Sequence, residues 1–464
     1  MIITENRMIS LIVFHTILTA FLQASNVNAM YSLQPENKDI QKTCYKFDFG
    51  QGKVEPGYIQ VVPEMNYSKE RGFGFLNDDS VISSIDRGSD DALCSDFITG
   101  IKPFFFAVDV PEGDYNVTVY LGDKEGESVT TIKAESRRLM LENVHTAEGE
   151  FVTRVFTTNI RYSTINNNEE VKLTSRETGG HPNWDKKLTI EFNNVRPCIC
   201  ALEITRVEDA ITVYLTGNST VTDQQYEPWA AWGQMLPRFF KPGKISVANH
   251  AESGESLKSF IAENRLKKIL SEIKPGDYML IQFGHNDQKP QNSTYVKPFT
   301  GYKEYLKLFI GELRKHDAIP VLVTSMHRRK FDDTGKIINT HGDYPEAMRQ
   351  AAREENVPLI DLHEMSRIFY EALGPEDSKK AFVHYPAGTF PGQNEEYKDN
   401  SHFNNYGAYQ LARCVVEGIK ANKLDIAKYL VNDIQPYDPA YPDPAEEWTL
   451  PVSPAINITK PDGS

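Results

Sequence analysis

The sequence predicts two folded parts, an antiparallel β-sandwich followed by an α/β domain with a parallel sheet flanked by helices. Between residues 41 and 208, short runs of alternating apolar and polar residues dominate, and long helical patterns are absent. From residue 209 to 430, apolar strands alternate with helical patterns at 255–273, 302–315 and 344–355. This alternation is typical of a doubly wound sheet with right-handed crossovers.

Residues 1–29 have the pattern of a secretory signal peptide. Arg7 supplies a positive charge, residues 8–21 are mostly apolar, and residues 27–29 fit a cleavage site of small residues. The apolar run is short and interrupted by His15 and Thr16, so we expect no membrane span. The protein is therefore expected to be exported to the periplasm or the extracellular space, with a linker at 30–40.

The sandwich is expected between residues 41 and 208. Alternating runs predict strands at 45–49, 106–110, 115–121, 188–192 and 200–204, and the turn residues at 111–114 predict a hairpin. Trp184 is either a platform on which a sugar stacks or a core residue. Residues 431–464 are rich in Pro and Asp, and we expect an extended tail on the surface.

The chain has five cysteines, an odd number, so at least one thiol is free: Cys44, Cys94, Cys198, Cys200 and Cys414. Cys44 and the Cys198/Cys200 pair lie near the two ends of the sandwich sequence, where first and last strands often pair. A disulfide between them is one expectation in an oxidising compartment. Cys198 and Cys200 have no neighbouring His, so the zinc signal is weak, and we expect no metal.

Ser219 is the first candidate catalytic residue. The run at 211–216 alternates apolar and polar residues and breaks at Gly217, which predicts a strand that ends in a turn carrying Ser219. Open α/β sheets bind ligands at the carboxyl ends of their strands. The alternative is a helix cap or a plain turn, since Asn and Ser are favoured there. A helical segment is expected at 229–240, after Pro228.

Gly254 and Asn286 are candidate oxyanion donors. Gly254 lies between an apolar run and a helical pattern, where a glycine lets the backbone N–H approach a ligand. Asn286 follows the buried strand expected at 278–283, and its amide offers two N–H donors to a developing oxyanion. Either residue alone is equally typical of an ordinary loop.

Asp399 and His402 complete the candidate site. Their three-residue spacing lets the carboxylate reach Nδ1–H of the imidazole and leaves Nε2 free to accept the Ser219 proton. A helical stripe begins just after them, so the alternative is an Asp that caps the helix beside a surface His.

Taken together and in this order, the four blocks resemble the SGNH (GDSL-like) hydrolase superfamily. The resemblance implies a flavodoxin-like sheet, a triad of Ser219, His402 and Asp399, and an oxyanion hole of Ser219, Gly254 and Asn286. Position 218 is Asn where the usual block reads Gly-Asp-Ser, which removes one carboxylate beside the nucleophile.

Within the superfamily the chain is most similar to rhamnogalacturonan acetylesterases, over residues 209–430. The matching segments are 217–221, 232–233, 249–254, 283–287 and 399–403. This implies an esterase that removes acetyl groups from a plant cell-wall polysaccharide through an acetyl-enzyme, without a cofactor. The first part, opening with Phe-Asp-Phe-Gly50, resembles galactose-binding-like domains of carbohydrate-active enzymes.

The net charge of −14 argues against binding to nucleic acid or to anionic membranes. Pectic polymers are also anionic, so a local basic patch is required, and His327, Arg328 and Arg329 are the candidates for substrate binding. The alternative is a solvated loop.

Other functions remain open from the sequence. The same machinery could act on another acylated glycan, a methyl ester or a lipid. A non-catalytic carbohydrate-binding protein on a hydrolase fold is the other alternative. The sequence does not indicate an oligomeric state.

Overall fold

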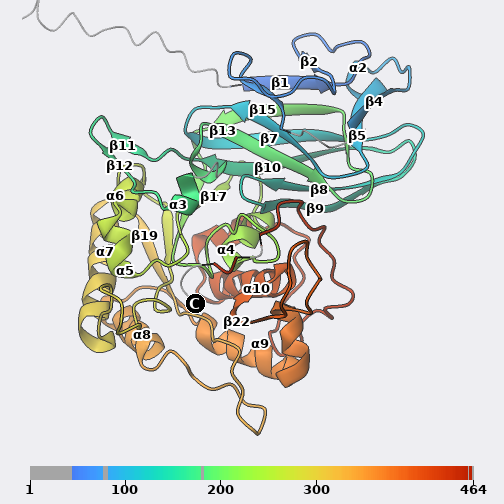
Figure 1. Cartoon of the computed structure of the whole chain (residues 1–464). Coiled ribbons are helices and arrows are strands. Elements are labelled where there is room, and N and C mark those ends of the chain that lie inside the picture. The colour runs from blue at the N-terminus through green and yellow to red at the C-terminus, as the bar shows by residue number, and fades with distance from the viewer. Residues whose placement is uncertain (1–43, 77–81, 179–181, 458, 462–464) are drawn as a thin grey trace, which may run out of the picture. The chain divides into compact units, whose positions relative to one another are not determined.

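The structure, a computed structural model, describes residues 44–76, 82–178, 182–457 and 459–461 (Figure 1). The predicted signal peptide and linker lie outside the described residues, so export stays a prediction. Among the described residues, no helix combines the length and apolar character needed to cross a membrane.

The sandwich consists of two five-stranded sheets, in the orders β10-β7-β15-β1-β2 and β3-β6-β13-β8-β9, beside a three-stranded sheet β14-β5-β4. Except for β1 with β2, neighbouring strands are antiparallel. Alternate side chains of β7, Val117, Val119 and Leu121, are buried in the core between the sheets, as the period of two predicts. The predicted β-sandwich is confirmed.

The strands of this part are β1 Cys44–Phe49, β2 Ile59–Val61, β3 Phe73–Phe75, β4 Ile82–Asp86, β5 Asp96–Gly100, β6 Phe104–Asp109, β7 Gly113–Gly122, β8 Ser128–Ala134, β9 Arg138–Thr146, β10 Phe151–Ile160, β11 Thr164–Asn166, β12 Glu169–Glu170, β13 Lys187–Asn193, β14 Cys198–Ile199 and β15 Ala201–Val207. The short helices are α2 Ala92–Ser95, α3 Ser175–Thr178 and η1 Pro182–Trp184.

The second part has a five-stranded parallel sheet in the order β17-β16-β18-β19-β20. In chain order this is 2-1-3-4-5, the flavodoxin-like arrangement. Val213 and Leu215 of β16 belong to one core with α4, α9 and α10, whereas Tyr214 between them belongs to the core with α5 to α8. Because successive strand residues face opposite sides, helices cover both faces of the sheet. The predicted fold class is confirmed.

The strands of this part are β16 Ile211–Thr216, β17 Ile245–Asn249, β18 Tyr278–Ile281, β19 Ile319–Val323, β20 Leu359–Ile360, β21 Phe382–Tyr385 and β22 Tyr397–Phe403. The helices are α4 Trp232–Met235, η2 Leu236–Phe239, α5 Leu257–Ala262, α6 Arg265–Leu270, η3 Pro298–Tyr302, α7 Lys303–Lys315, α8 Tyr344–Glu355, α9 Leu362–Asp377, η4 Ser378–Ala381, α10 Asn405–Ala421 and η5 Asp425–Tyr429.

Two predicted helices are shorter than expected. The pattern at 255–273 is divided into α5 and α6 by Asn264, whose φ of 63° is left-handed and which therefore interrupts the helix. The segment expected at 229–240 forms only one α-helical turn, followed by the 3₁₀ turn η2, in which Pro237 lacks an N–H to continue an α-helix.

The disulfide expected between Cys44 and the Cys198/Cys200 pair is wrong, because all five cysteines are free thiols. Cys44 is the first residue of β1, opposite Thr205 of β15. Cys200 lies at the other end of the same pair of strands, where its carbonyl accepts from Phe49 N. At roughly 3.4 Å per residue the two thiols are too far apart to join.

Trp184 is a core residue and not an exposed platform. Its side chain is 9% exposed, and its indole Nε1 donates to Glu177 Oε1 over 2.8 Å. Of the two interpretations left open by the sequence, the structure supports the second.

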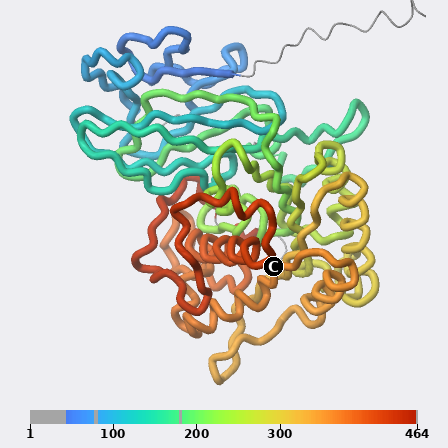
Figure 2. Tube along the Cα trace, turned by 180° about the vertical axis from the view of Figure 1, so that it is seen from behind, coloured from blue at the N-terminus to red at the C-terminus, as the bar shows by residue number. Residues whose placement is uncertain are grey.

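The tail after η5 lies against both parts of the protein, as the red segment in Figure 2 shows. Trp448 packs on Tyr406 and Tyr409 of α10, and the buried Lys133 of β8 donates to Pro451 O over 2.7 Å. Beyond these contacts, Ile456 forms a parallel bridge with Glu227, which brings the following residues close to the loop after Ser219.

Candidate active site

Ser219, His402 and Asp399 form one hydrogen-bonded chain. His402 Nε2 lies 2.9 Å from Ser219 Oγ, and His402 Nδ1 lies 2.8 Å from Asp399 Oδ2. Ser219 follows β16 in a tight turn that Asn218 closes, since its Oδ1 accepts from Thr220 N over 3.2 Å. The three residues predicted from separate sequence blocks therefore meet in the order that a serine nucleophile requires.

The Asp399 carboxylate is held in its charged form. Its Oδ1 accepts from Ser401 N and His402 N over 2.8 and 3.1 Å, and Lys460 Nζ lies 3.4 Å from Oδ2. Although burial raises the pKa of Asp399, the hydrogen bond and charge of His402, the Ser401 N–H and Lys460 lower it below its ordinary value overall. The helix cap considered as an alternative role belongs to Asn404, whose side chain accepts from Gly407 N.

Asn286 has one amide N–H in use and one available. Its Nδ2 donates to Glu255 O over 2.9 Å, and Glu255 is the neighbour of Gly254, whose φ is 88°. The two predicted oxyanion donors are therefore adjacent in space. Asn286 is 1% exposed, and its Oδ1 is buried without a hydrogen-bond partner among the described residues.

Asp287 holds the Asn286 loop in place, a role that sequence reasoning missed. Its two carboxylate oxygens accept from Leu257 N and Gly284 N over 2.9 and 2.8 Å. These bonds join the loop after β18 to the start of α5, the helix that begins three residues after Gly254. Burial raises the pKa of Asp287 to about 6, although the backbone N–H groups oppose this.

The three predicted substrate-binding residues lie in different environments. His327 is 3% exposed and stacks on His363 with ring centroids 3.6 Å apart, and burial lowers its pKa to about 3. Arg329 is bonded to the protein, donating to Asn400 Oδ1 and Ser378 Oγ. Arg328 lies beside the predicted oxyanion donor, with Nη2 3.4 Å from the carbonyl of His285, which precedes Asn286. Of the three, Arg328 is best placed to meet a substrate.

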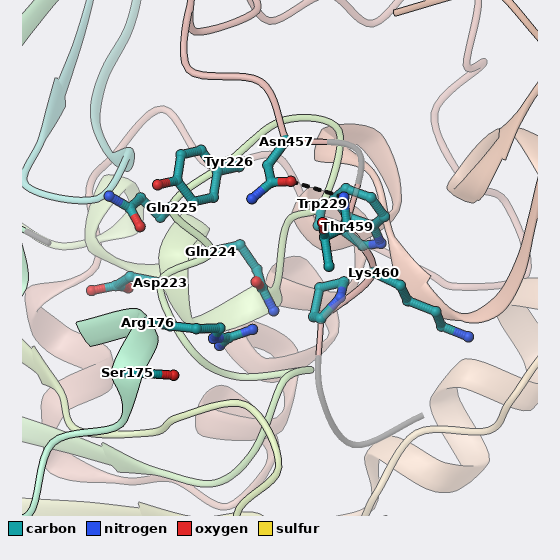
Figure 3. A pocket seen from close by; sticks show the side chains of 11 residues that line it. Ser175, Arg176, Asp223, Gln224, Gln225, Tyr226, Trp229, Asn457, Thr459 and Lys460 are labelled. Carbon is teal, nitrogen blue, oxygen red and sulfur yellow. Dashed lines mark hydrogen bonds between the residues drawn. The ribbon is translucent and has the colours of Figure 1, made fainter. Parts of the chain in front are cut away.

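A pocket of about 220 Å³ adjoins the loop that follows Ser219. Its lining comes from three separate segments, α3, the loop after Ser219 and the C-terminal tail, as Figure 3 shows. Gln224 in its wall donates to Ser219 O over 2.7 Å. Arg176 and Lys460 also line it, and no pattern in the sequence pointed to either residue.

No metal centre is found in the part of the chain that the structure describes. Within it, no group of three or more His, Cys, Asp or Glu side chains is placed to hold an ion.

Comparison with known proteins assigns both parts of the chain. Residues 45–147 match the family described as "Beta-agarase/YXIM esterase-like, galactose-binding domain-like", and residues 214–407 match the "GDSL-like Lipase/Acylhydrolase family". The chain is 44% identical over 224 residues to the rhamnogalacturonan acetylesterase RhgT of Bacillus subtilis (strain 168), covering 48% of this chain and 95% of RhgT. The chain belongs to the GDSL-like lipase/acylhydrolase family. It is a serine esterase, and the predicted family resemblance is confirmed.

A second relative extends over both parts of this GDSL-like esterase. The "uncharacterized esterase YxiM" of Bacillus subtilis (strain 168) is 28% identical over 403 residues, covering 82% of this chain and 92% of YxiM. A crystal structure of YxiM aligns with a TM-score of 0.43 and 26% identity, covering 82% of this chain and 99% of that one. The GDSL-like family match ends at residue 407, so neither Arg176 nor Lys460 lies within it.

The sandwich of this GDSL-like esterase braces the loop that follows Ser219. Arg138, at the start of β9, places Nε 2.6 Å from Asp223 Oδ2, and both side chains are buried. Arg137 Nη1 donates to Trp229 O and Gln224 O over 2.8 and 3.1 Å. Because Gln224 in turn donates to Ser219 O, the contacts link the sandwich to the turn that carries Ser219.

Replacing Arg138 with Ala is expected to destabilise the protein strongly, because it leaves the Asp223 carboxylate buried and unpaired. Breaking one side of a buried ion pair lowers the free energy of unfolding by about 3–5 kcal/mol. Chemical unfolding of the wild type and the variant measures this change.

Arg154→Ala is the matched control, since Arg154 is exposed on β10 and forms no ion pair with a described residue. The expected loss there is within about 0.5 kcal/mol. Equal stability of the two variants would show that the Arg138–Asp223 pair does not brace the loop.

Proposed function

We propose that this protein removes acetyl groups from an acetylated plant cell-wall polysaccharide, rhamnogalacturonan, through a covalent acetyl-enzyme on Ser219. The observation that carries the proposal is the hydrogen-bonded chain from Asp399 through His402 to Ser219. The name of RhgT, the relative with 44% identity, supports the choice of ester and polymer.

In the first half of the reaction, Ser219 Oγ attacks the acetyl carbonyl carbon while His402 Nε2 accepts the hydroxyl proton. The carbonyl oxygen becomes negatively charged and is stabilised by Asn286 Nδ2–H and by the N–H groups of Gly254 and Ser219. The bond to the sugar oxygen then breaks, and His402 returns the proton to that oxygen, which leaves as a hydroxyl group.

In the second half, His402 accepts a proton from a water molecule that attacks the acetyl-enzyme. The bond to Ser219 Oγ breaks, and Ser219 regains its proton from His402. The product leaves as acetic acid and loses its proton to the solvent, giving acetate. Asp399 stays charged throughout, holding the imidazole orientation and stabilising the imidazolium.

Release of acetate from defined polymers tests the proposal. The expected result is acetate from acetylated rhamnogalacturonan at a higher kcat/KM than from acetylated xylan, and no methanol from a methyl-esterified pectin. Methanol as the main product, or fatty acid from a lipid ester, would overturn it. A folded protein that a covalent serine reagent does not label would instead be a carbohydrate-binding protein.

The value of kcat/KM is expected to fall about tenfold per pH unit on the acid side, because a protonated His402 cannot accept the Ser219 proton. Asp399 adds no second acid limb, since its lowered pKa keeps the carboxylate charged while the pH falls through the ordinary Asp range. Initial rates on a soluble acetyl ester between about pH 4 and 8 measure this profile.

The control for the pH profile is enzyme held at each pH and assayed after return to neutral pH, which separates reversible protonation from unfolding. A profile without an acid limb would contradict the role of His402 as base. A limb twice as steep would mean that a second group, such as Asp399, must also be ionised.

A further inference from the structure

Three cationic residues lie on segments that border the catalytic residues. Lys289 follows β18, and its backbone N donates to Asn286 O over 3.2 Å. Arg328 follows β19 and reaches the carbonyl of His285, while Lys460 of the tail lies 3.4 Å from Asp399 Oδ2. Arg328 and Lys460 thus contact the immediate neighbour of Asn286 and Asp399 itself through their charged groups, whereas Lys289 is held beside Asn286 by its backbone.

Two of the three cations have no acidic partner in the described structure. Neither Lys289 nor Arg328 forms an ion pair with a carboxylate of any described residue. Arg328 Nη1 faces two neutral groups, Thr340 Oγ1 and His341 Nδ1. In the amide orientation of Gln288 that satisfies the surrounding donors, Gln288 Oε1 also accepts from both Arg328 Nη atoms. A half-buried guanidinium bonded only to neutral acceptors keeps its full attraction for an anion.

The adjacent Arg329 shows what a structural arginine does in this loop. Its Nε and Nη1 donate to Ser378 Oγ and Asn400 Oδ1, and its backbone N donates to Asn400 O over 2.8 Å. The two bonds to Asn400 tie the loop after β19 to β22, the strand that carries Asp399, and the bond to Ser378 ties it to η4. Arg328 makes no corresponding bond to that strand in the described structure, so its charge serves another purpose.

Lys289 lies within reach of the charges of the other two residues. Burial, and then the charges of Arg328 and Lys460, lower the pKa of Lys289. Burial alone lowers the pKa of Arg328. The Asp399 carboxylate offsets the charge of Lys460, whereas Lys289 and Arg328 have no such carboxylate beside them in the described structure. Two like charges held near one another are unfavourable without a bound anion.

We propose that Lys289, Arg328 and Lys460 form a subsite for a carboxylate of the polymer, on a uronate residue beside the acetylated sugar. The proposal rests on the proposed polysaccharide esterase function and adds the group that is recognised. Arg328 supplies a planar fork that suits a carboxylate, and the two ammonium groups supply point charges. The subsite would offset the repulsion between a polyanion and a protein of net charge −14.

The test compares an acetylated, uronate-containing polymer with the same polymer after its carboxyl groups are reduced to alcohols, matched for acetyl content. The wild type is expected to favour the acidic polymer in kcat/KM. Lys289→Gln and Arg328→Gln are each expected to lower the ratio of the two kcat/KM values about tenfold, or ~1.4 kcal/mol, mostly through KM. Arg328→Lys should retain part of the preference.

The matched control is Lys297→Gln, an exposed lysine in the same loop as Lys289, which should leave the ratio unchanged. Raising the ionic strength to about 1 M, where the Debye length is ~3 Å, should reduce the wild-type ratio. Reduction of both kcat/KM values by the same factor in both Gln variants would overturn the subsite.

Two further outcomes separate the possible failures. Equal kcat/KM of the wild type on the two polymers overturns the carboxylate subsite but leaves the esterase proposal intact. Acetate release from neither polymer, while a small aryl acetate is hydrolysed, overturns both. The product acetate is also a carboxylate and could occupy the same cations. Galacturonate and acetate are therefore compared as inhibitors at equal ionic strength. Equal inhibition by the two would assign the cations to product binding and overturn the subsite.

Discussion

Replacing Ser219 with Ala is expected to reduce kcat on acetyl esters by on the order of 10³-fold or more, while the fold is kept. The change removes only Oγ, which lies 2.9 Å from His402 Nε2 and has no other hydrogen-bond partner among the described residues. His402 keeps its bond to Asp399, so the imidazole stays in position but has no hydroxyl to activate. Steady-state kinetics with circular dichroism of both proteins measures the effect.

Ser246→Ala is the control for this substitution. Ser246 is a buried serine of β17 whose Oγ donates to Asp114 Oδ1 over 2.6 Å. The change should lower stability by about 1 kcal/mol and leave kcat within a few-fold. Near-wild-type turnover in folded Ser219→Ala would remove the proposed mechanism, since no other described serine contacts His402 Nε2.

The sequence predicted the core of the site because each block had a local physical signature. Gly217 ended an alternating strand before Ser219, Asn286 followed a buried strand, and Asp399 preceded His402 by three residues. The parallel sheet order places the ends of β16 and β18 side by side, so these local patterns determined which residues would meet. The helices that pack on the sheet were predicted for the same reason, from their apolar stripes.

What the sequence could not predict depends on contacts between distant segments. Lys460 is 61 residues from Asp399 in the chain, and no local pattern relates them. The Arg138–Asp223 pair joins the sandwich to the loop behind Ser219, and each residue alone resembles a surface charge. A charged or polar residue in the sequence does not show whether its side chain is exposed, because that depends on partners in other parts of the chain. For the same reason the sequence did not predict that His327 is buried.

Asn286→Ala is expected to lower kcat by ~10²–10³-fold, or about 3–4 kcal/mol, with little change in KM. In the ground state the acetyl carbonyl is neutral, whereas in the tetrahedral state its oxygen carries a charge, so a fixed N–H is worth far more there. The bond from Asn286 Nδ2 to Glu255 O fixes the amide before substrate arrives. Gly254 and Ser219 N–H groups remain in the variant, so activity should not vanish.

Asn286→Asp is expected to be worse than Asn286→Ala. The new carboxylate oxygen would face the Glu255 carbonyl, now without a donor between them, and would repel the developing oxyanion. Asn292→Ala, an exposed asparagine in the same loop, is the matched control and should keep its kcat. Kinetics and circular dichroism on all four proteins decide the assignment. If folded Asn286→Ala changed only in KM, Asn286 would bind ground-state substrate, and its role as oxyanion donor would be wrong.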